Sequence, residues 1–70
     1  MPYVNIKVTR TGVTAEQKRQ LIVGVTDLLT RVLDKPAAWT VVVVDEVETD
    51  NWGMAGETAT DLIKRLARGG

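Results

Sequence analysis

The sequence contains no cysteine and no histidine. Without cysteine the chain has no disulfide and no thiolate metal site. Without histidine it lacks the commonest metal ligand and the usual proton shuttle at neutral pH. Catalytic arrangements of the Ser-His-Asp or Cys-His type are therefore excluded. Glycine-rich phosphate-binding motifs are missing as well. We therefore expect neither a metal nor a cofactor.

An excess of charge of one sign is also missing, because nine basic and nine acidic residues give a formal net charge of zero. A nucleic-acid partner would favour a basic surface, so we expect none. No apolar run approaches the ~20 residues that a membrane span needs. The first residues lack the basic start and long apolar stretch of a signal peptide. We expect a cytoplasmic protein with no membrane partner.

The length limits what the chain can do alone. Its 70 residues predict a single domain over 1–70. A core of this size rarely supplies more than about 3–5 kcal/mol of stability by itself, and disulfides, metals or partner subunits usually add the rest. Because the composition excludes a disulfide and disfavours a metal, we expect the chain to associate with further subunits.

Alternation and helical spacing predict the main elements. Apolar and polar residues alternate over 3–9, as in a half-buried strand. Thr14 and Gln17 have the spacing of a capping box, and apolar residues then recur at helical spacing, which predicts a helix. The helix should end before Pro36, because a proline disfavours helical geometry at the residue that precedes it. The valine-rich run 39–44 predicts a second strand, buried on both faces. Together these form a β-α-β unit whose strands we expect to be parallel.

The rest of the chain predicts smaller elements. One acidic cluster lacks the spacing of a Ca²⁺ loop, and we interpret it as a surface loop; it comprises Asp45, Glu46, Glu48 and Asp50. Residues 52–56 predict a hairpin or tight loop, and 59–66 a short C-terminal helix. The fold class is therefore α/β, or α+β in some schemes. Two strands and one helix cannot cover both faces of a sheet, so neighbouring subunits are expected to complete it.

Pro2 is the unusual candidate for chemistry. A proline after the initiator methionine permits removal of Met1, which exposes a secondary amine. A chain-terminal amine has a reference pKa of about 8, and an apolar pocket lowers that pKa by disfavouring the cation. Such a group can take a proton from carbon or oxygen and return it elsewhere, which is tautomerisation. The structural alternative is that Pro2 only stiffens the start of a strand.

Several segments together resemble the 4-oxalocrotonate tautomerase family. They are Met1-Pro2 before a strand, the helix start Glu16-Gln17-Lys18, the valine-rich strand ending in Asp45-Glu46, and the segment Asn51-Trp52-Gly53-Met54-Ala55-Gly56-Glu57. The resemblance covers most of the chain, and it implies a β-α-β unit with a short hairpin. It also implies subunit pairs that share a four-stranded sheet, and a homohexamer of three such pairs. Pro2 would be the general base of a cofactor-free isomerase, with pockets between subunits.

The resemblance implies further residues of the pocket. Trp52 stands where the family has a pocket aromatic, whereas Val13 and Val41 replace two arginines that bind a dicarboxylate. Arg10 is a candidate substitute for them, with an exposed turn arginine or an intersubunit salt bridge as alternatives. Without the arginines, a 2-hydroxy-2-enoate of lower charge, such as phenylenolpyruvate, suits the pocket better than 2-hydroxymuconate. Further candidates are Trp39 and Met54, for which core or interface packing is the alternative, and Thr9, which ends the first strand on its polar face.

Two other functions fit the same sequence. Heteromeric assemblies exist in this family, so the chain could be a non-catalytic or partner-dependent subunit that takes its missing arginines from another chain. An oligomeric interaction module without a small-molecule site is the second alternative. Removal of Met1 bears on all three, because an attached methionine makes the Pro2 nitrogen part of an amide, which cannot act as this base.

Overall fold

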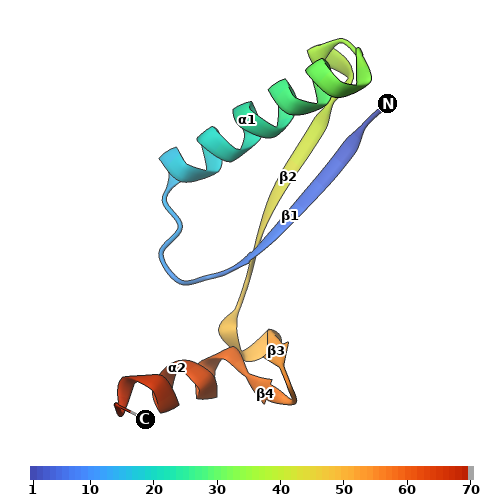
Figure 1. The fold of residues 1–70 in the computed structure, drawn as a ribbon. Helices are drawn as coiled ribbons and strands as arrows, with labels where there is room; N and C mark the ends of the chain where they lie inside the picture. Colours follow the sequence, from blue (N-terminus) through green and yellow to red (C-terminus); the bar gives the residue numbers. More distant parts are fainter. Residues whose placement is uncertain (70) are drawn as a thin grey trace.

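The computed structural model describes residues 1–69, and residue 70 of the predicted domain lies outside the described residues. A β-α-β unit is followed by a small hairpin and a second helix (Figure 1). The unit comprises β1 (Tyr3–Thr9), α1 (Ala15–Leu33) and β2 (Val41–Val47). β1 and β2 run parallel, in a register that pairs Tyr3 with Val41 and Thr9 with Val47. The predicted β-α-β unit with parallel strands is confirmed.

The ends of α1 follow from local chemistry. Thr14 Oγ1 accepts the Gln17 N–H at 3.1 Å, and Gln17 Oε1 accepts the Thr14 N–H at 2.9 Å, which is the predicted capping box. At the other end Asp34 adopts the left-handed conformation, with φ 54°, and its N–H donates to the Thr30 carbonyl at 3.0 Å. Within residues 1–69 no helix combines the length and the apolar character that crossing a bilayer requires.

The second strand begins later than the predicted run 39–44. Trp39 belongs instead to a short 3₁₀ helix, Ala37–Trp39, in which its N–H donates to the Pro36 carbonyl at 3.0 Å. Pro36 fixes the backbone at the start of this turn, and the extended conformation begins only at Thr40. The valine pattern alone does not reveal this turn.

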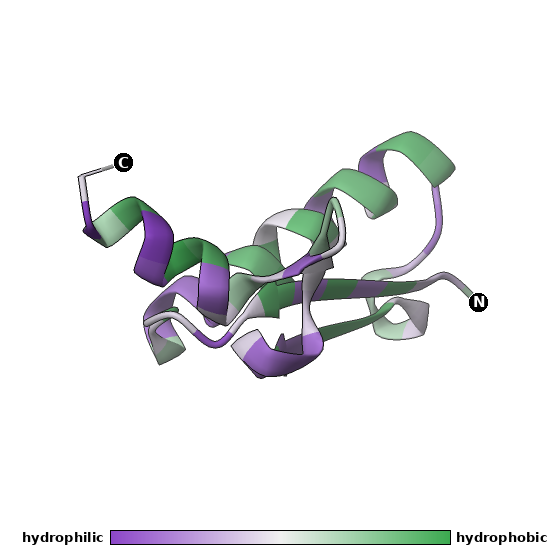
Figure 2. Ribbon diagram, turned by 90° about the horizontal axis from the view of Figure 1, so that it is seen from below, coloured by the Kyte–Doolittle hydropathy of each residue, from purple (hydrophilic) through white to green (hydrophobic). Residues whose placement is uncertain are grey.

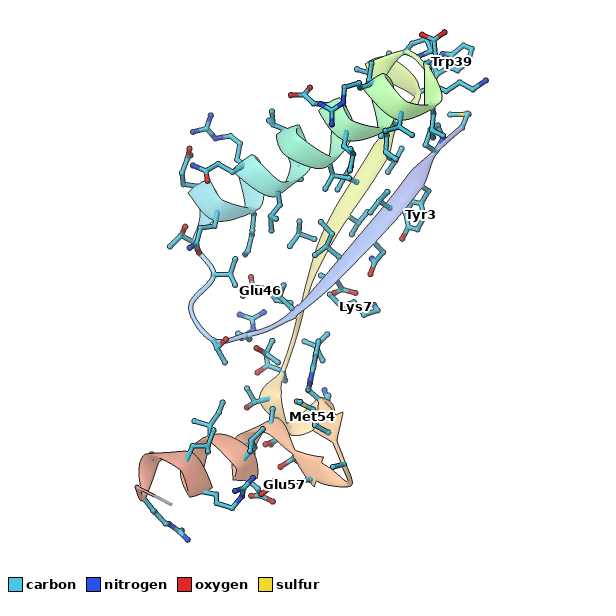
Figure 3. All side chains as sticks on the ribbon, in the orientation of Figure 1. Tyr3, Lys7, Trp39, Glu46, Met54 and Glu57 are labelled. Carbon is cyan, nitrogen blue, oxygen red and sulfur yellow. The ribbon has the colours of Figure 1, made fainter. Side chains whose placement is uncertain are left out.

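The strand also continues through two residues of the acidic cluster. Asp45 and Glu46 lie in β2, so their interpretation as loop residues is wrong. Each carboxylate has a lysine partner: Asp45 bonds Lys7 across the ladder at 2.8 Å, and Glu46 bonds Lys18 of α1. These pairs compensate the negative charges and allow acidic residues to continue the strand. Figure 3 shows Glu46 on the α1 side of the sheet and Lys7 on the opposite side.

The C-terminal third forms a compact arm. It contains a 3₁₀ turn and three further elements, namely β3 (Gly53–Met54), β4 (Glu57–Thr58) and α2 (Ala59–Ala67). Ala55 and Gly56, the two residues between the strands, have φ values of 54° and 83°, the pattern of a type I′ hairpin. Arg65 of α2 donates two hydrogen bonds, each 3.1 Å long, to the Glu57 carboxylate and so ties the hairpin to the helix. The predicted hairpin and C-terminal helix are confirmed.

The chain covers little of its apolar surface by itself. Among the described residues only Ala59 is buried. The radius of gyration is 15.8 Å, whereas a compact domain of this length has about 11 Å. The arm extends away from the β-α-β unit (Figure 1), and hydrophobic stretches occur on the strands and on both helices (Figure 2). These surfaces lack cover within one chain, which fits the predicted association with further subunits.

The face of the sheet opposite α1 is the clearest example. Tyr3 is 64% exposed there, and Val41 and Val43 are 48% and 38% exposed. The prediction that β2 is buried on both faces is therefore wrong for the single chain, in which α1 covers one face only. The alternation of exposed and half-buried valines follows directly from the two-residue period of a strand.

Candidate active site

Pro2 lies immediately before β1, at the end of the sheet where β2 begins. Its carbonyl accepts the Val41 N–H at 3.0 Å, which extends the parallel ladder by one step. Pro2 is half-buried, whereas Met1 is 94% exposed. The sheet therefore fixes the backbone of Pro2, while the preceding residue is solvated.

Large apolar side chains gather at this end of the sheet. Tyr3 and Val41 are register partners, so they lie side by side on the face opposite α1. Trp39, two residues before Val41, lies at the same end of the molecule as Tyr3 (Figure 3) and is 49% exposed. The structure thus brings Trp39 and Val41, two of the positions singled out by the sequence, to the Pro2 end of the chain.

Thr40 was not among the expected site residues. The register that pairs Tyr3 with Val41 places Thr40 opposite Pro2. Its Oγ1 is buried and has no hydrogen-bond partner among the described residues, which is unusual for a buried hydroxyl. No signal in the sequence singles it out, because threonine before a valine run is ordinary strand composition.

Thr9 and Arg10 lie at the opposite end of β1. Thr9 forms the last pair of the ladder, with Val47, and the Arg10 N–H donates to the Val47 carbonyl at 2.8 Å. At about 3.3 Å of rise per strand residue, roughly 26 Å separate Arg10 from Pro2. Within one chain Arg10 therefore cannot contact a small molecule bound at Pro2.

The cations at this end are already paired with carboxylates. Arg10 Nε lies 2.7 Å from Glu48 Oε1, in a pair whose side chains are 59% and 61% exposed. The Lys18–Glu46 pair is less exposed, at 31% and 19%. The hydrogen bond from Lys18 lowers the pKa of Glu46, and the hydrogen bond to Asp45 raises the pKa of Lys7. None of these three cations carries an uncompensated charge.

Trp52 and Met54 lie on the arm. Trp52 is half-buried, and its carbonyl accepts the Ala59 N–H at 2.7 Å, which anchors it to the start of α2. Met54 is 55% exposed in β3, and Figure 3 shows it far from Trp39. The expected site residues thus fall into separate groups, with Pro2 and Trp39 at one end of the sheet, Thr9 and Arg10 at the other, and Trp52 and Met54 beyond it.

An open hollow lies between the end of β1 and the start of α1. Its volume is about 380 Å³, within the range of small-molecule pockets. Val13 contributes to its lining, at one of the two positions where the resemblance described above implies an arginine. None of the lining side chains is charged. The lining consists of Val8, Val13, Gln17, Gln20 and Leu21.

Comparisons with known proteins find relatives over most of the chain. A family model described as "Tautomerase enzyme" matches residues 2–62. Probable tautomerase K2 of Dickeya dadantii is 64% identical over 61 residues, which cover 87% of this chain and 91% of that protein. The 2-hydroxymuconate tautomerase of Bacillus subtilis is 34% identical, over 89% of this chain and 98% of that protein. The crystal structure of DmpI from Helicobacter pylori is similar with a TM-score of 0.82 and 46% identity, over 90% of this chain and 97% of that chain.

Proposed function

The chain belongs to the tautomerase family, with relatives of the 4-oxalocrotonate tautomerase type, and on this premise we propose that Pro2 is its general base once Met1 is removed. The observation that carries the proposal is the position of Pro2, half-buried and fixed by the Val41 N–H beside apolar side chains. Such surroundings favour a neutral amine, so we expect the pKa of the Pro2 amine to lie below the reference of about 8.

The proposed reaction is the interconversion of an enol and a keto acid without a cofactor. The neutral Pro2 amine takes the hydroxyl proton of a 2-hydroxy-2-enoate, and the carbon–oxygen double bond forms as the carbon–carbon double bond opens. The resulting ammonium returns a proton to carbon 3 of the same molecule. One group thus acts as base and then as acid, which requires a pKa close to the working pH.

A second copy of the chain is part of this proposal. Within one chain about 26 Å of strand separate Pro2 from Arg10, and Trp52 lies farther along, on the arm. If two copies pair antiparallel about a twofold axis, the Pro2 end of one copy meets the Arg10 end of the other. The exposed face of the sheet supports the packing of further copies against it, and a homohexamer of three pairs is the assembly we propose.

The proposed substrate carries one carboxylate. Val13 and Val41 cannot supply the charge-assisted hydrogen bonds that a second carboxylate would require, and the charge of Arg10 is already compensated by Glu48. The Bacillus relative is named for 2-hydroxymuconate. For this chain we propose an enol such as phenylenolpyruvate instead.

Pro2→Ala tests the base. With Met1 removed from both proteins, we expect the variant to ketonise phenylenolpyruvate at least about 10²-fold more slowly, because a positioned general base contributes that much or more. The decay of enol absorbance measures the rate, and light scattering confirms that the assembly has the wild-type mass. A variant rate within twofold of the wild-type rate would reject Pro2 as the base.

The valines at positions 13 and 41 favour one alternative, a subunit that depends on a different chain for its arginines. That alternative predicts a purified homo-oligomer that begins at Pro2, folds normally and turns over neither enol. Activity of the purified chain alone would exclude it.

A further inference from the structure

The pairing of Arg10 with Glu48 follows from the register of the sheet. Thr9 pairs with Val47 at the end of the ladder, so the next residues of the two strands, Arg10 and Glu48, emerge side by side. The Arg10 N–H bonds the Val47 carbonyl at 2.8 Å, which fixes the backbone, and Arg10 Nε lies 2.7 Å from Glu48 Oε1. The register therefore places the two side chains within reach of each other.

Two further charges make the surroundings of Arg10 neutral. Lys18 and Glu46 form their own pair nearby. The hydrogen bond from Lys18 is the main cause of the lowered pKa of Glu46, and the charge of Arg10 adds the smallest contribution. Arg10 is thus close to two carboxylates, and the four side chains carry two positive and two negative charges. An anion that approaches Arg10 therefore also meets the negative charges of Glu48 and Glu46.

We propose that Glu48 sets the charge preference of the active site by neutralising Arg10, so that monoanionic enols are accepted and dianionic enols are disfavoured. This inference rests on the proposed function, in which Arg10 of one copy faces Pro2 of another. Glu48 acts through Arg10 and does not itself touch the reacting atoms. A second carboxylate on the substrate would meet a guanidinium whose charge Glu48 already compensates, whereas a monoanion such as phenylenolpyruvate has no second carboxylate that needs this contact.

Glu48→Gln tests the inference, with 2-hydroxymuconate as the dianionic probe and phenylenolpyruvate as the monoanionic probe. Removing the negative charge of Glu48 lessens its repulsion of the substrate, and this effect is twice as large for a dianion as for a monoanion. It also leaves Arg10 without its carboxylate partner. For an exposed ion pair we expect KM for the dianion to fall by about fivefold relative to KM for the monoanion. The kcat values should stay the same, and the gain should shrink at high ionic strength, because salt screens exposed charges.

Three variants control the experiment. Glu48→Asp keeps the charge and should preserve the wild-type selectivity. Glu16→Gln removes a carboxylate from another exposed pair with an arginine, Arg19, and should leave the selectivity unchanged. In the double variant Arg10→Gln/Glu48→Gln the gain should disappear, because the guanidinium that Glu48 neutralises is absent. A selectivity ratio in Glu48→Gln equal to that of active wild-type protein would overturn the inference and leave the proposed function intact.

A second readout does not depend on turnover. Adipate and hexanoate are unreactive acids of equal length with two carboxylates and one, and the NMR signal of the Arg10 Nε–H reports their binding. In Glu48→Gln we expect adipate, but not hexanoate, to shift this signal at about fivefold lower concentration than in wild type. Equal titrations in the two proteins would overturn the inference. Wild-type protein that is inactive towards both enols would reject the proposed function instead.

Discussion

Val43→Lys should dissociate the assembly. Val43 lies in the middle of β2 on the face opposite α1, where its side chain is 38% exposed in the single chain. Full burial of a valine side chain contributes about 1.5–3 kcal/mol, so covering the exposed part contributes roughly 1 kcal/mol per copy. A lysine at the same position would in addition bury an ammonium group, at a cost of several kcal/mol. At about 3 kcal/mol per copy, association weakens by roughly 10²-fold for each copy in the assembly.

Sedimentation velocity at several micromolar concentrations measures the effect. We expect wild-type protein to sediment as a multiple of the single chain and Val43→Lys to sediment as smaller species. Val23→Lys is the matched control, because Val23 is 54% exposed on the outer face of α1, close to Asp27 and Arg31. It should keep the wild-type mass. A wild-type monomer, or a Val43→Lys variant with unchanged mass, would refute the argument that the open face of the sheet is an interface.

Two further predictions concern stability. In Gly24→Ala the new Cβ meets nothing within 4 Å in the chain. Urea unfolding at fixed protein concentration should therefore show a free energy of unfolding that is higher by about 1 kcal/mol, because alanine has the greater helix propensity. A lower free energy of unfolding would indicate that another copy packs against Gly24. The hydrogen bond from Lys18 lowers the pKa of Glu46 below its ordinary 4.5 in the folded state, so its stabilising effect is present above that value and is lost as the pH falls through the folded pKa. Unfolding free energies measured from about pH 5 to 3 should therefore fall less steeply in Glu46→Gln than in wild type; equal slopes would contradict the pairing.

Local chemistry made much of the fold predictable. The Thr14–Gln17 capping box and the alternation over 3–9 depend only on neighbouring residues, and both predictions hold. One error is local, because the turn after Pro36 delays the start of β2. Another involves residues far apart in the sequence. Asp45 and Glu46 remain in β2 because the ladder with β1 continues through them, and there they pair with Lys7 and Lys18; no short sequence window contains both members of these pairs.

The candidate site was less predictable, for a related reason. Pro2 stands out through its place at the start of the sequence and through the family resemblance. The distance between Pro2 and Arg10, however, depends on the length of a folded strand. The Arg10–Glu48 contact depends on strand register, and a slip by one residue would turn every side chain of the strand to the opposite face. Thr40 became visible only because the register places it opposite Pro2.

Nitrogen-15 NMR of the Pro2 nitrogen in active protein tests the central claim most directly. The account predicts an amine signal, present because Met1 is gone, that titrates with a pKa below about 8, so that the neutral form is available when the enol binds. An amide signal at Pro2, or an amine that stays protonated throughout the pH range of turnover, would contradict it.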